Sequence, residues 1–202
     1  ADVARPSPGG SHRHGEAAAV ALLRRALAAG RTTKVVGDQA VLAHLEDRTM
    51  AARVHIDTRS RQGTQVSVFD PDGRVLASSV APDQVTADGA SPVDLIAGAY
   101  VLSTSGDVQV AGRLSTVIEA QDEHGEVAKR WWVDDATGVL LWQESYDDDG
   151  LSTAAGFTDV RVEPYAGGLP PAVSRLATSV ASAHAAELSS SGWSCSDELV
   201  GL

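Results

Sequence analysis

Several residue types are scarce in this sequence, and each shortage excludes a class of protein. Only two of the 202 residues are lysine and the formal net charge is −11, so the chain lacks the clustered basic surface that binding to a nucleic acid duplex requires. The single cysteine, Cys195, excludes an internal disulfide but leaves open a partner beyond Leu202. The longest apolar run, residues 17–23, is far shorter than the ~20 residues of a membrane-spanning helix, so any membrane anchor is expected outside this sequence.

The residue patterns of common catalytic and metal sites are missing as well. The six histidines form no H-E-x-x-H pair, and there is no GxSxG elbow or glycine-rich phosphate loop. Asp134 and Asp135 are neighbours in a predicted hairpin, and adjacent strand residues point to opposite faces, so the two carboxylates cannot converge on one substrate atom. Residues 147–150 resemble half of a calcium loop without its closing glutamate, and His12 with His14 offers too few ligands for a metal. We therefore predict no enzymatic activity, no catalytic residue, no cofactor and no metal site.

The composition that is present is typical of one globular domain. The chain is 43% hydrophobic but only 4% aromatic, which predicts a core of Ala, Val and Leu. Residues 1–15 have no apolar period and are predicted to be a disordered leader. Residues 16–29 are predicted to form a helix that ends at Gly30. The face that this helix is expected to bury carries Val20, Leu23 and Leu27.

From residue 33 the apolar period changes to the alternation that is typical of strands. Four antiparallel strands are predicted at residues 33–45, 50–58, 64–70 and 74–79. A short helix follows, with Ser91 as its N-cap, Pro92 at its first position and its end near Ala99. Further strands are predicted at residues 100–102, 106–112, 114–121, 127–133, 139–146 and 151–163. Because every connection is short, the strands are expected to form an antiparallel meander.

The predicted fold class is α+β: a strongly curved antiparallel sheet, an open half barrel, with helices packed on its concave side. The weak apolar character of one side of residues 64–69 favours a sheet with one concave face and one wet face. This domain is expected to span residues 16–165. Residues 166–191 are predicted to be a linker and a helix, because residues 172–188 have apolar positions at helical spacing.

Residues 126–150 carry the strongest hairpin signal in the chain. Two runs of β-branched, apolar and aromatic residues flank Asp-Asp-Ala-Thr-Gly, which is typical of a turn. We predict a three-residue loop with a G1 bulge and with Gly138 at positive φ. The expected cross-strand pairs are Trp132 with Trp142, Arg130 with Glu144, and Val133 with Leu141. A one-residue slip would instead pair Trp132 with Leu141, and in either register Trp131 and Trp132 point to opposite faces.

A series of short motifs in this half of the chain resembles a known family. The motifs are Val110-Ala-Gly-Arg113, Glu119-Ala120, Trp132-Val-Asp134, Thr137-Gly-Val-Leu-Leu141 and Glu144-Ser-Tyr-Asp147. In their order and spacing they resemble the large N-terminal domain of the MucB/RseB-type sigma-factor regulatory proteins, in its actinobacterial version. The likeness runs from residue 100 to residue 162. Residues 192–202 then resemble the opening of that family's smaller second domain; alternatively, they are an apolar tail of this domain.

The resemblance implies both a fold and a function. The implied fold is that of the LolA and LolB lipoprotein carriers, with a hydrophobic cavity for acyl chains. The implied function is regulatory: an extracytoplasmic stress-response protein of the cell envelope that binds the outward-facing part of an anti-sigma factor and modulates its proteolysis, with lipid as a signal. Two alternatives stay open, namely a lipid or lipoprotein carrier with the same fold and a ligand-free scaffold module.

A ligand site is predicted in the concavity between the sheet and the helices. Strands rich in Ala, Val and Thr offer few large side chains to fill a curved sheet, so we expect a cleft lined by the larger residues. An apolar or amphipathic ligand, or a segment of the partner protein, would bind there. The predicted ligand-binding residues are Trp132, Trp142, Leu140, Val20, Leu23 and Leu27. The alternative is that the helices fill the concavity and leave a solid core.

Overall fold

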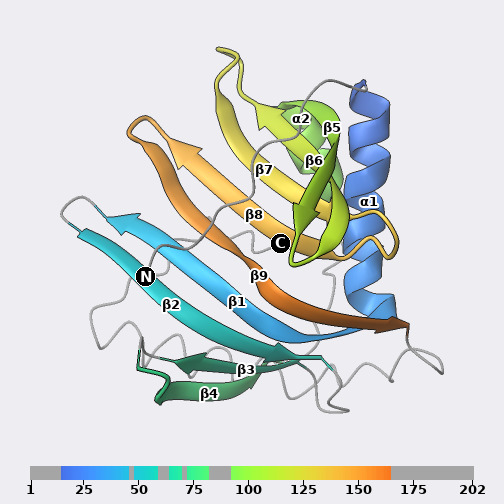
Figure 1. The fold of residues 1–202 in the computed structure, drawn as a ribbon. Helices are drawn as coiled ribbons and strands as arrows, with labels where there is room; N and C mark the ends of the chain where they lie inside the picture. The colour runs from blue at the N-terminus through green and yellow to red at the C-terminus, as the bar shows by residue number, and fades with distance from the viewer. Residues whose placement is uncertain (1–14, 46–47, 59–63, 70–71, 82–91, 165–202) are drawn as a thin grey trace, which may run out of the picture.

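The computed structural model describes residues 15–45, 48–58, 64–69, 72–81 and 92–164 (Figure 1). Two helices and nine strands follow one another along the chain. They are α1 Glu16–Thr32, β1 Thr33–Leu45, β2 Arg48–Asp57, β3 Thr64–Phe69, β4 Val75–Ala81, α2 Pro92–Ala99, β5 Val101–Val110, β6 Arg113–Gln121, β7 Val127–Asp134, β8 Leu140–Asp147 and β9 Gly150–Pro164. The predictions for the leader, for residues 166–191, for residues 192–202 and for Cys195 lie outside these ranges.

All nine strands belong to one antiparallel sheet with the order β4-β3-β2-β1-β9-β8-β7-β6-β5. Two meanders, β1 to β4 and β5 to β9, are joined where β1 pairs with β9. The sheet is open, because β4 and β5 occupy its two edges and do not pair with each other. Helices α1 and α2 lie against the side of β5, β6 and β7 (Figure 1). The predicted α+β class with an open antiparallel sheet is therefore confirmed.

Most elements lie within two residues of their predicted bounds, and larger differences occur at the end of α1 and in β5. Helix α1 does not end at Gly30 but continues to Thr32 and passes directly into β1. The buried Ala29 packs in the core at that point, so tertiary contact overrides the tendency of glycine to end the helix. The two strands predicted at residues 100–102 and 106–112 are one strand, β5, in which the pairing shifts between Ser105 and Val108 and Asp107 has a φ of 68°. A break is predicted from the sequence at these polar residues, but a β-bulge accommodates them within one continuous strand.

The central hairpin has the predicted aromatic pair but a different loop. Trp132 lies opposite Trp142 and Arg130 opposite Glu144, which confirms those two pairs. The prediction of Val133 opposite Leu141 is wrong, because Val133 pairs with Leu140 and the register shifts next to it.

The reason for this difference lies in the turn. Gly138 has the expected positive φ of 80°, and its N–H donates to the carbonyl oxygen of Asp134 at 2.8 Å. The N–H of Asp134 in turn donates to the carbonyl oxygen of Val139 at 2.8 Å, so the loop spans four residues rather than three. A four-residue loop alone would pair Trp132 with Leu141. The extra residue in β8 restores the tryptophan pair.

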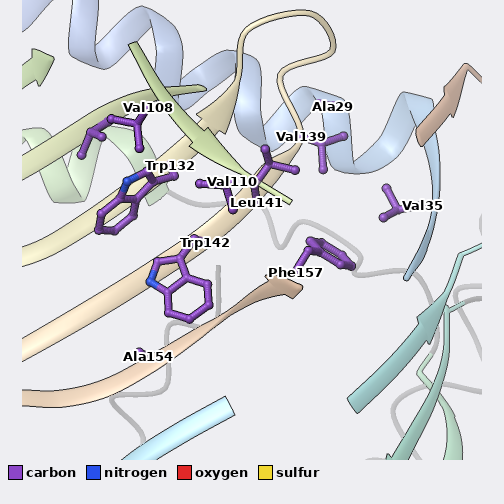
Figure 2. Packing of buried hydrophobic residues seen from close by; sticks show 11 residues of the cluster. Ala29, Val35, Val108, Val110, Trp132, Val139, Leu141, Trp142, Ala154 and Phe157 are labelled. Carbon is purple, nitrogen blue, oxygen red and sulfur yellow. The ribbon is translucent and has the colours of Figure 1, made fainter. Parts of the chain in front are cut away.

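Buried apolar residues form two clusters. The tryptophan cluster, which Figure 2 shows, consists of Ala29, Val35, Val108, Val110, Val117, Trp132, Val139, Leu141, Trp142, Ala154 and Phe157. The helix cluster consists of Ala19, Leu23, Val93, Leu102, Ile118, Ala120, Trp131 and Val133. The neighbours Trp131 and Trp132 belong to different clusters, as the alternation of strand side chains requires, so the clusters lie on opposite faces of β6 and β7.

Candidate functional site

The six residues predicted to bind a ligand do not form one site. Trp132 and Trp142 belong to the tryptophan cluster, where they are 0% and 2% exposed. Leu23 lies in the helix cluster, against which Val20, Leu27 and Leu140 also pack. The two sets are separated by the sheet itself, so a single ligand cannot touch both. A role in ligand binding for either set stays a prediction.

The strand register reveals a different apolar surface on the face of the sheet that carries the helices. Trp131 of the helix cluster is followed across the neighbouring strands by Gln143, Ala155 and Val41, each opposite the next. Because side chains alternate along a strand, this face continues over β1, β2 and β3. The larger apolar residues that it presents there, which we call the valine face, are Val41, Val54, Ile56, Val66 and Val68.

The valine face is apolar and only half-buried. All five of its side chains have intermediate exposure. Helix α1 makes its main sheet contacts with β5 and smaller ones with β6 and β1, so the helices cover the other half of this face (Figure 1). A partly exposed apolar surface of this kind is typical of a site for an apolar ligand or for the apolar side of a partner segment.

The opposite face of the same strands carries more polar side chains, together with the apolar Ala40 and Leu42 on β1. His55 and Asp38 are cross-strand neighbours there, with Nδ1 of His55 at 2.7 Å from Oδ1 of Asp38. Ser67 and Ser78 continue the row on β3 and β4, with their hydroxyl oxygens 3.0 Å apart. The two faces of β2 and β3 therefore differ in polarity, and the valine face is the more apolar one. The sequence signal for this was the alternation of Val66 and Val68 with polar neighbours, which by itself did not show that the apolar side stays half-exposed.

The family-like motifs meet in a polar network beside Trp142. Arg130 donates from Nε to Oε2 of Glu119 at 2.9 Å and from Nη1 to the hydroxyl oxygen of Tyr146 at 2.8 Å. Glu144 is buried and accepts bonds from the Tyr146 hydroxyl and, at 3.0 Å, from Nε1 of Trp142. The sequence predicted only the opposition of Arg130 and Glu144. The contributions of Glu119 and Tyr146 depend on the register of three neighbouring strands, which no local pattern reveals.

The protonation states of this network follow from its contacts. Burial raises the pKa of Tyr146, and the bond to the Glu144 carboxylate raises it further, so the phenol stays a donor. Burial alone would lower the pKa of Arg130, but the bond to Glu119 and the nearby negative charges outweigh it and the pKa is raised. Arg130 therefore stays charged in this network, and Tyr146 keeps its phenolic proton. This arrangement suits a rigid structural support on the sheet.

A second charged contact anchors the β5–β6 hairpin to the β7–β8 turn. Nε and Nη2 of Arg113 donate to the two carboxylate oxygens of Asp134, each at 2.9 Å. The Asp134 carboxylate also accepts a bond from the N–H of Thr137 at 2.8 Å. Burial alone would raise the pKa of Asp134, but the bonds from Arg113 and Thr137 outweigh it and the pKa is lowered. The Asp134 carboxylate thus links the β5–β6 hairpin to the β7–β8 turn through an ion pair with Arg113.

Two absences concern only the described part of the chain. Neither α1 nor α2 is long and apolar enough to cross a membrane. Between residues 15 and 164, outside the gaps given above, no three His, Cys, Asp or Glu side chains are placed to hold a metal ion.

Comparison with known proteins identifies the fold. No protein-family model and no curated protein matches the sequence. A solved structure of MucB shares 18% sequence identity with this chain at a TM-score of 0.50, over 77% of this chain and 60% of that chain. This chain has the fold of MucB. A chain of the Pseudomonas aeruginosa MucA/MucB complex shares 19% identity at a TM-score of 0.50, over 76% of this chain and 58% of that chain.

The match confirms the resemblance to MucB at the level of the fold, and it covers the greater part of this chain. It spans less than two thirds of the length of either solved chain. The actinobacterial version of the family and the likeness to lipoprotein carriers stay predictions.

Proposed function

We propose that this domain is an extracytoplasmic regulatory module that binds the outward-facing segment of an anti-sigma factor and modulates the proteolysis of that segment. The observation that carries the proposal is the fold shared with MucB, which has been solved in a complex with MucA. The order of motifs from Val110 to Asp147 supports the same assignment, because those motifs resemble regulators of this type.

The valine face is the surface that we assign to binding. It is apolar, half-buried and free of charged side chains, whereas the other face of the same strands carries His55 and Asp38. An amphipathic partner segment, or an acyl chain that competes with it, would gain apolar burial there at roughly 25 cal/mol per Å². Competition between the two ligands would let lipid act as the signal that releases the partner.

We further propose that the domain performs no chemistry. The buried carboxylates of Glu144 and Asp134 already accept hydrogen bonds from Trp142, Tyr146, Arg113 and Thr137. A carboxylate held in this way supports the structure and is not poised to take a proton from a substrate.

The proposal is tested by capture of the partner. The purified chain, immobilised, is incubated with detergent-solubilised membranes of its host, and bound proteins are identified by mass spectrometry. We expect the extracytoplasmic segment of an anti-sigma factor among them, and we expect the chain to change the rate at which a protease cleaves that segment. Capture of no such segment would refute the assignment.

A matched pair of variants locates the binding surface. Val68→Glu places a charge on the valine face and should abolish capture, because burial of an unpaired carboxylate is unfavourable. Ser67→Glu places the same charge on the adjacent residue of β3, which points to the polar face, and should leave capture intact. Equal capture by both variants would exclude the valine face as the contact surface.

The apolar valine face also favours a second candidate function, a carrier of lipid or lipoprotein. Such a carrier would co-purify with lipid and move it between membranes without a protein partner. Lipid analysis of the purified chain and a vesicle transfer assay distinguish the carrier from the regulator. A scaffold module would give neither lipid nor a captured anti-sigma factor.

A further inference from the structure

Among the buried side-chain polar atoms of the described residues, one lacks a hydrogen-bond partner: Nε1 of Trp132. The side chain is 0% exposed and lies in the tryptophan cluster. Buried N–H groups are nearly always paired, because an unpaired one loses its bond to water without replacement. Trp142 on the next strand follows that rule and donates to Glu144. The Nε1–H group of Trp132 is therefore a buried donor that could bond to the acceptor of a ligand.

Residues 106–112, at the end of edge strand β5 and in the turn that follows, contribute to the cluster around this indole. Val108 and Val110 of the segment belong to the same cluster as Trp132. Figure 2 shows the nitrogen of Trp132 on the edge of the ring that is nearer to Val108. The unpaired donor therefore lies on the side of the ring toward Val108 of edge strand β5, which has a neighbouring strand on one side only.

The same segment contains the two non-glycine residues of the described chain that have positive φ. They are Asp107, at 68°, and Ala111, at 49°. Ala111 and Gly112, at 75°, are the two residues between β5 and β6, and a two-residue turn with both φ values positive favours Asn, Asp or Gly over alanine at its first position. Asp107 marks the place where the pairing of β5 with β6 shifts. Both ends of the segment therefore have backbone conformations that L-residues seldom adopt.

The neighbouring strand is held firmly by contrast. Arg113, at the start of β6, makes its two bonds to Asp134, and the carbonyl oxygen of Leu114 accepts a bond from the N–H of Asp135 at 3.0 Å. The side chain of Ser115 adds one bond to residues 106–112, from its hydroxyl to the carbonyl oxygen of Val108 at 3.0 Å. Residues 108–110 pair with residues 113–115 of β6, so movement of the segment would require only the end of the β5–β6 ladder to open.

We propose that residues 106–112 are a movable cover over a binding site whose polar group is Nε1 of Trp132. The ligand is a small, neutral, apolar molecule that carries a carbonyl oxygen. It is neutral because the cations on this face of β6 and β7, Arg130 and Arg113, already pair with Glu119 and Asp134, so a buried carboxylate would find no free cation there. It carries a carbonyl because the site offers one N–H donor and needs one acceptor. At β6 and β7 this site lies on the opposite face of the sheet from the helix cluster, and the proposal does not rest on the binding of an anti-sigma factor.

Two probes of matched shape test the proposal on the full chain. 2-Octanone carries the carbonyl oxygen, and 2-methyl-1-octene has a methylene group in its place. The indole N–H signals of the protein labelled with ¹⁵N-tryptophan are recorded by NMR during titration with each probe, and Trp132→Phe assigns the signal of Trp132. We expect 2-octanone to shift the Trp132 signal and to bind about fivefold or more tighter than 2-methyl-1-octene, the factor that one net hydrogen bond supplies.

A second variant tests the cover without removing the indole. Ala111→Asn suits the left-handed turn conformation and should stabilise the closed segment. We expect slower amide exchange at Val108 and Val110 and slower entry of 2-octanone than in the unmodified chain. Amide exchange at these two residues that is unchanged by Ala111→Asn would overturn the movable cover.

Three other results would overturn the binding site. One is a Trp132 signal that 2-octanone does not move, and another is equal affinity for the two probes. The third is a long-lived water bonded to Nε1, detected by magnetisation transfer from water to the indole N–H, because such a water would already satisfy the donor. Failure of this test leaves the capture experiment for the anti-sigma factor unaffected, since that experiment depends on the valine face.

Discussion

The ring of Trp142 lies directly over the backbone of Gly156 on the neighbouring strand. A Cβ atom at position 156 would be 2.4 Å from Cε3 of Trp142 and 2.6 Å from the carbonyl oxygen of Leu141. The two residues are opposite each other in the β8–β9 pairing. The absence of a side chain at Gly156 therefore makes room for a fully buried indole in the tryptophan cluster.

Replacement of Gly156 by alanine should destabilise the domain. The added methyl group must displace the indole or the backbone of β8, and overpacking of this kind lowers the free energy of unfolding by about 1–3 kcal/mol. Urea unfolding followed by tryptophan fluorescence measures the change. Gly106→Ala is the control, because a Cβ at that strand position would meet nothing within 4 Å. Equal stability of the two variants would contradict the close packing.

The contact of Trp142 with Gly156 illustrates what the sequence could and could not predict. The alternation of apolar and polar residues predicted the strands closely, and β1 has the predicted bounds, Thr33–Leu45. The turn signal at Gly138 and the aromatic pair were also found from local patterns. The pairing of β1 with β9 joins residues more than 100 positions apart, and no local pattern specifies it.

The candidate sites were harder to predict for the same reason. The alternation in residues 126–150 could place Trp131 and Trp132 on opposite faces, but it could not show that the helices pack on the face of Trp131. Large apolar residues of α1 and of the hairpin were therefore assigned to one cleft, although the sheet separates them. The valine face became recognisable only through the pairings among β1, β2 and β3.

Helix α1 is held to the sheet by Leu23, and truncation of this side chain should be costly. Leu23 is 2% exposed in the helix cluster. Leu23→Ala should lower the free energy of unfolding by about 2–5 kcal/mol, the usual range for a well-buried leucine. Chemical denaturation measures it, with Leu95→Ala as the control because Leu95 is 58% exposed on α2. A loss below about 1 kcal/mol for Leu23→Ala would mean that α1 is peripheral.

The ion pair between Arg113 and Asp134 should make the free energy of unfolding depend on pH, with lower stability in acid. The pKa of Asp134 in the folded state lies below its usual value, so the folded state binds the proton less readily than the unfolded state. The contribution of the carboxylate is therefore present above the unfolded pKa of about 3.9 and is lost as pH falls through the lower, folded pKa.

Asp134→Asn removes this charge and tests the expectation. At neutral pH the variant should be less stable by about 2–3 kcal/mol, because it loses charged hydrogen bonds at a buried position. The difference in Tm between the two proteins should narrow below about pH 4. Asp135→Asn is the control at the neighbouring, exposed position. A difference in Tm that stays constant from pH 7 to pH 3 would show that the charge of Asp134 does not stabilise the turn.

Tyr146 should lose its phenolic proton only at high pH, above the range that is usual for tyrosine. Its pKa is raised because burial disfavours the phenolate and because its hydroxyl donates to the Glu144 carboxylate, and Arg130 only partly opposes these effects. In the native protein, absorbance titration of its three tyrosines should therefore show a step above the ordinary value of about 10.

Substitution by phenylalanine assigns that step and links it to stability. Tyr146→Phe should remove the late step, whereas Tyr100→Phe, outside the network, should leave it in place. Because the folded pKa is the higher one, the unfolded chain loses this proton first. The contribution of Tyr146 is thus complete below about pH 10 and is lost as pH rises through the folded pKa. The free energy of unfolding should then fall more steeply above pH 10 in the unmodified protein than in Tyr146→Phe. Equal slopes would mean that the phenol is not held by Glu144 and that the polar network does not support this part of the sheet.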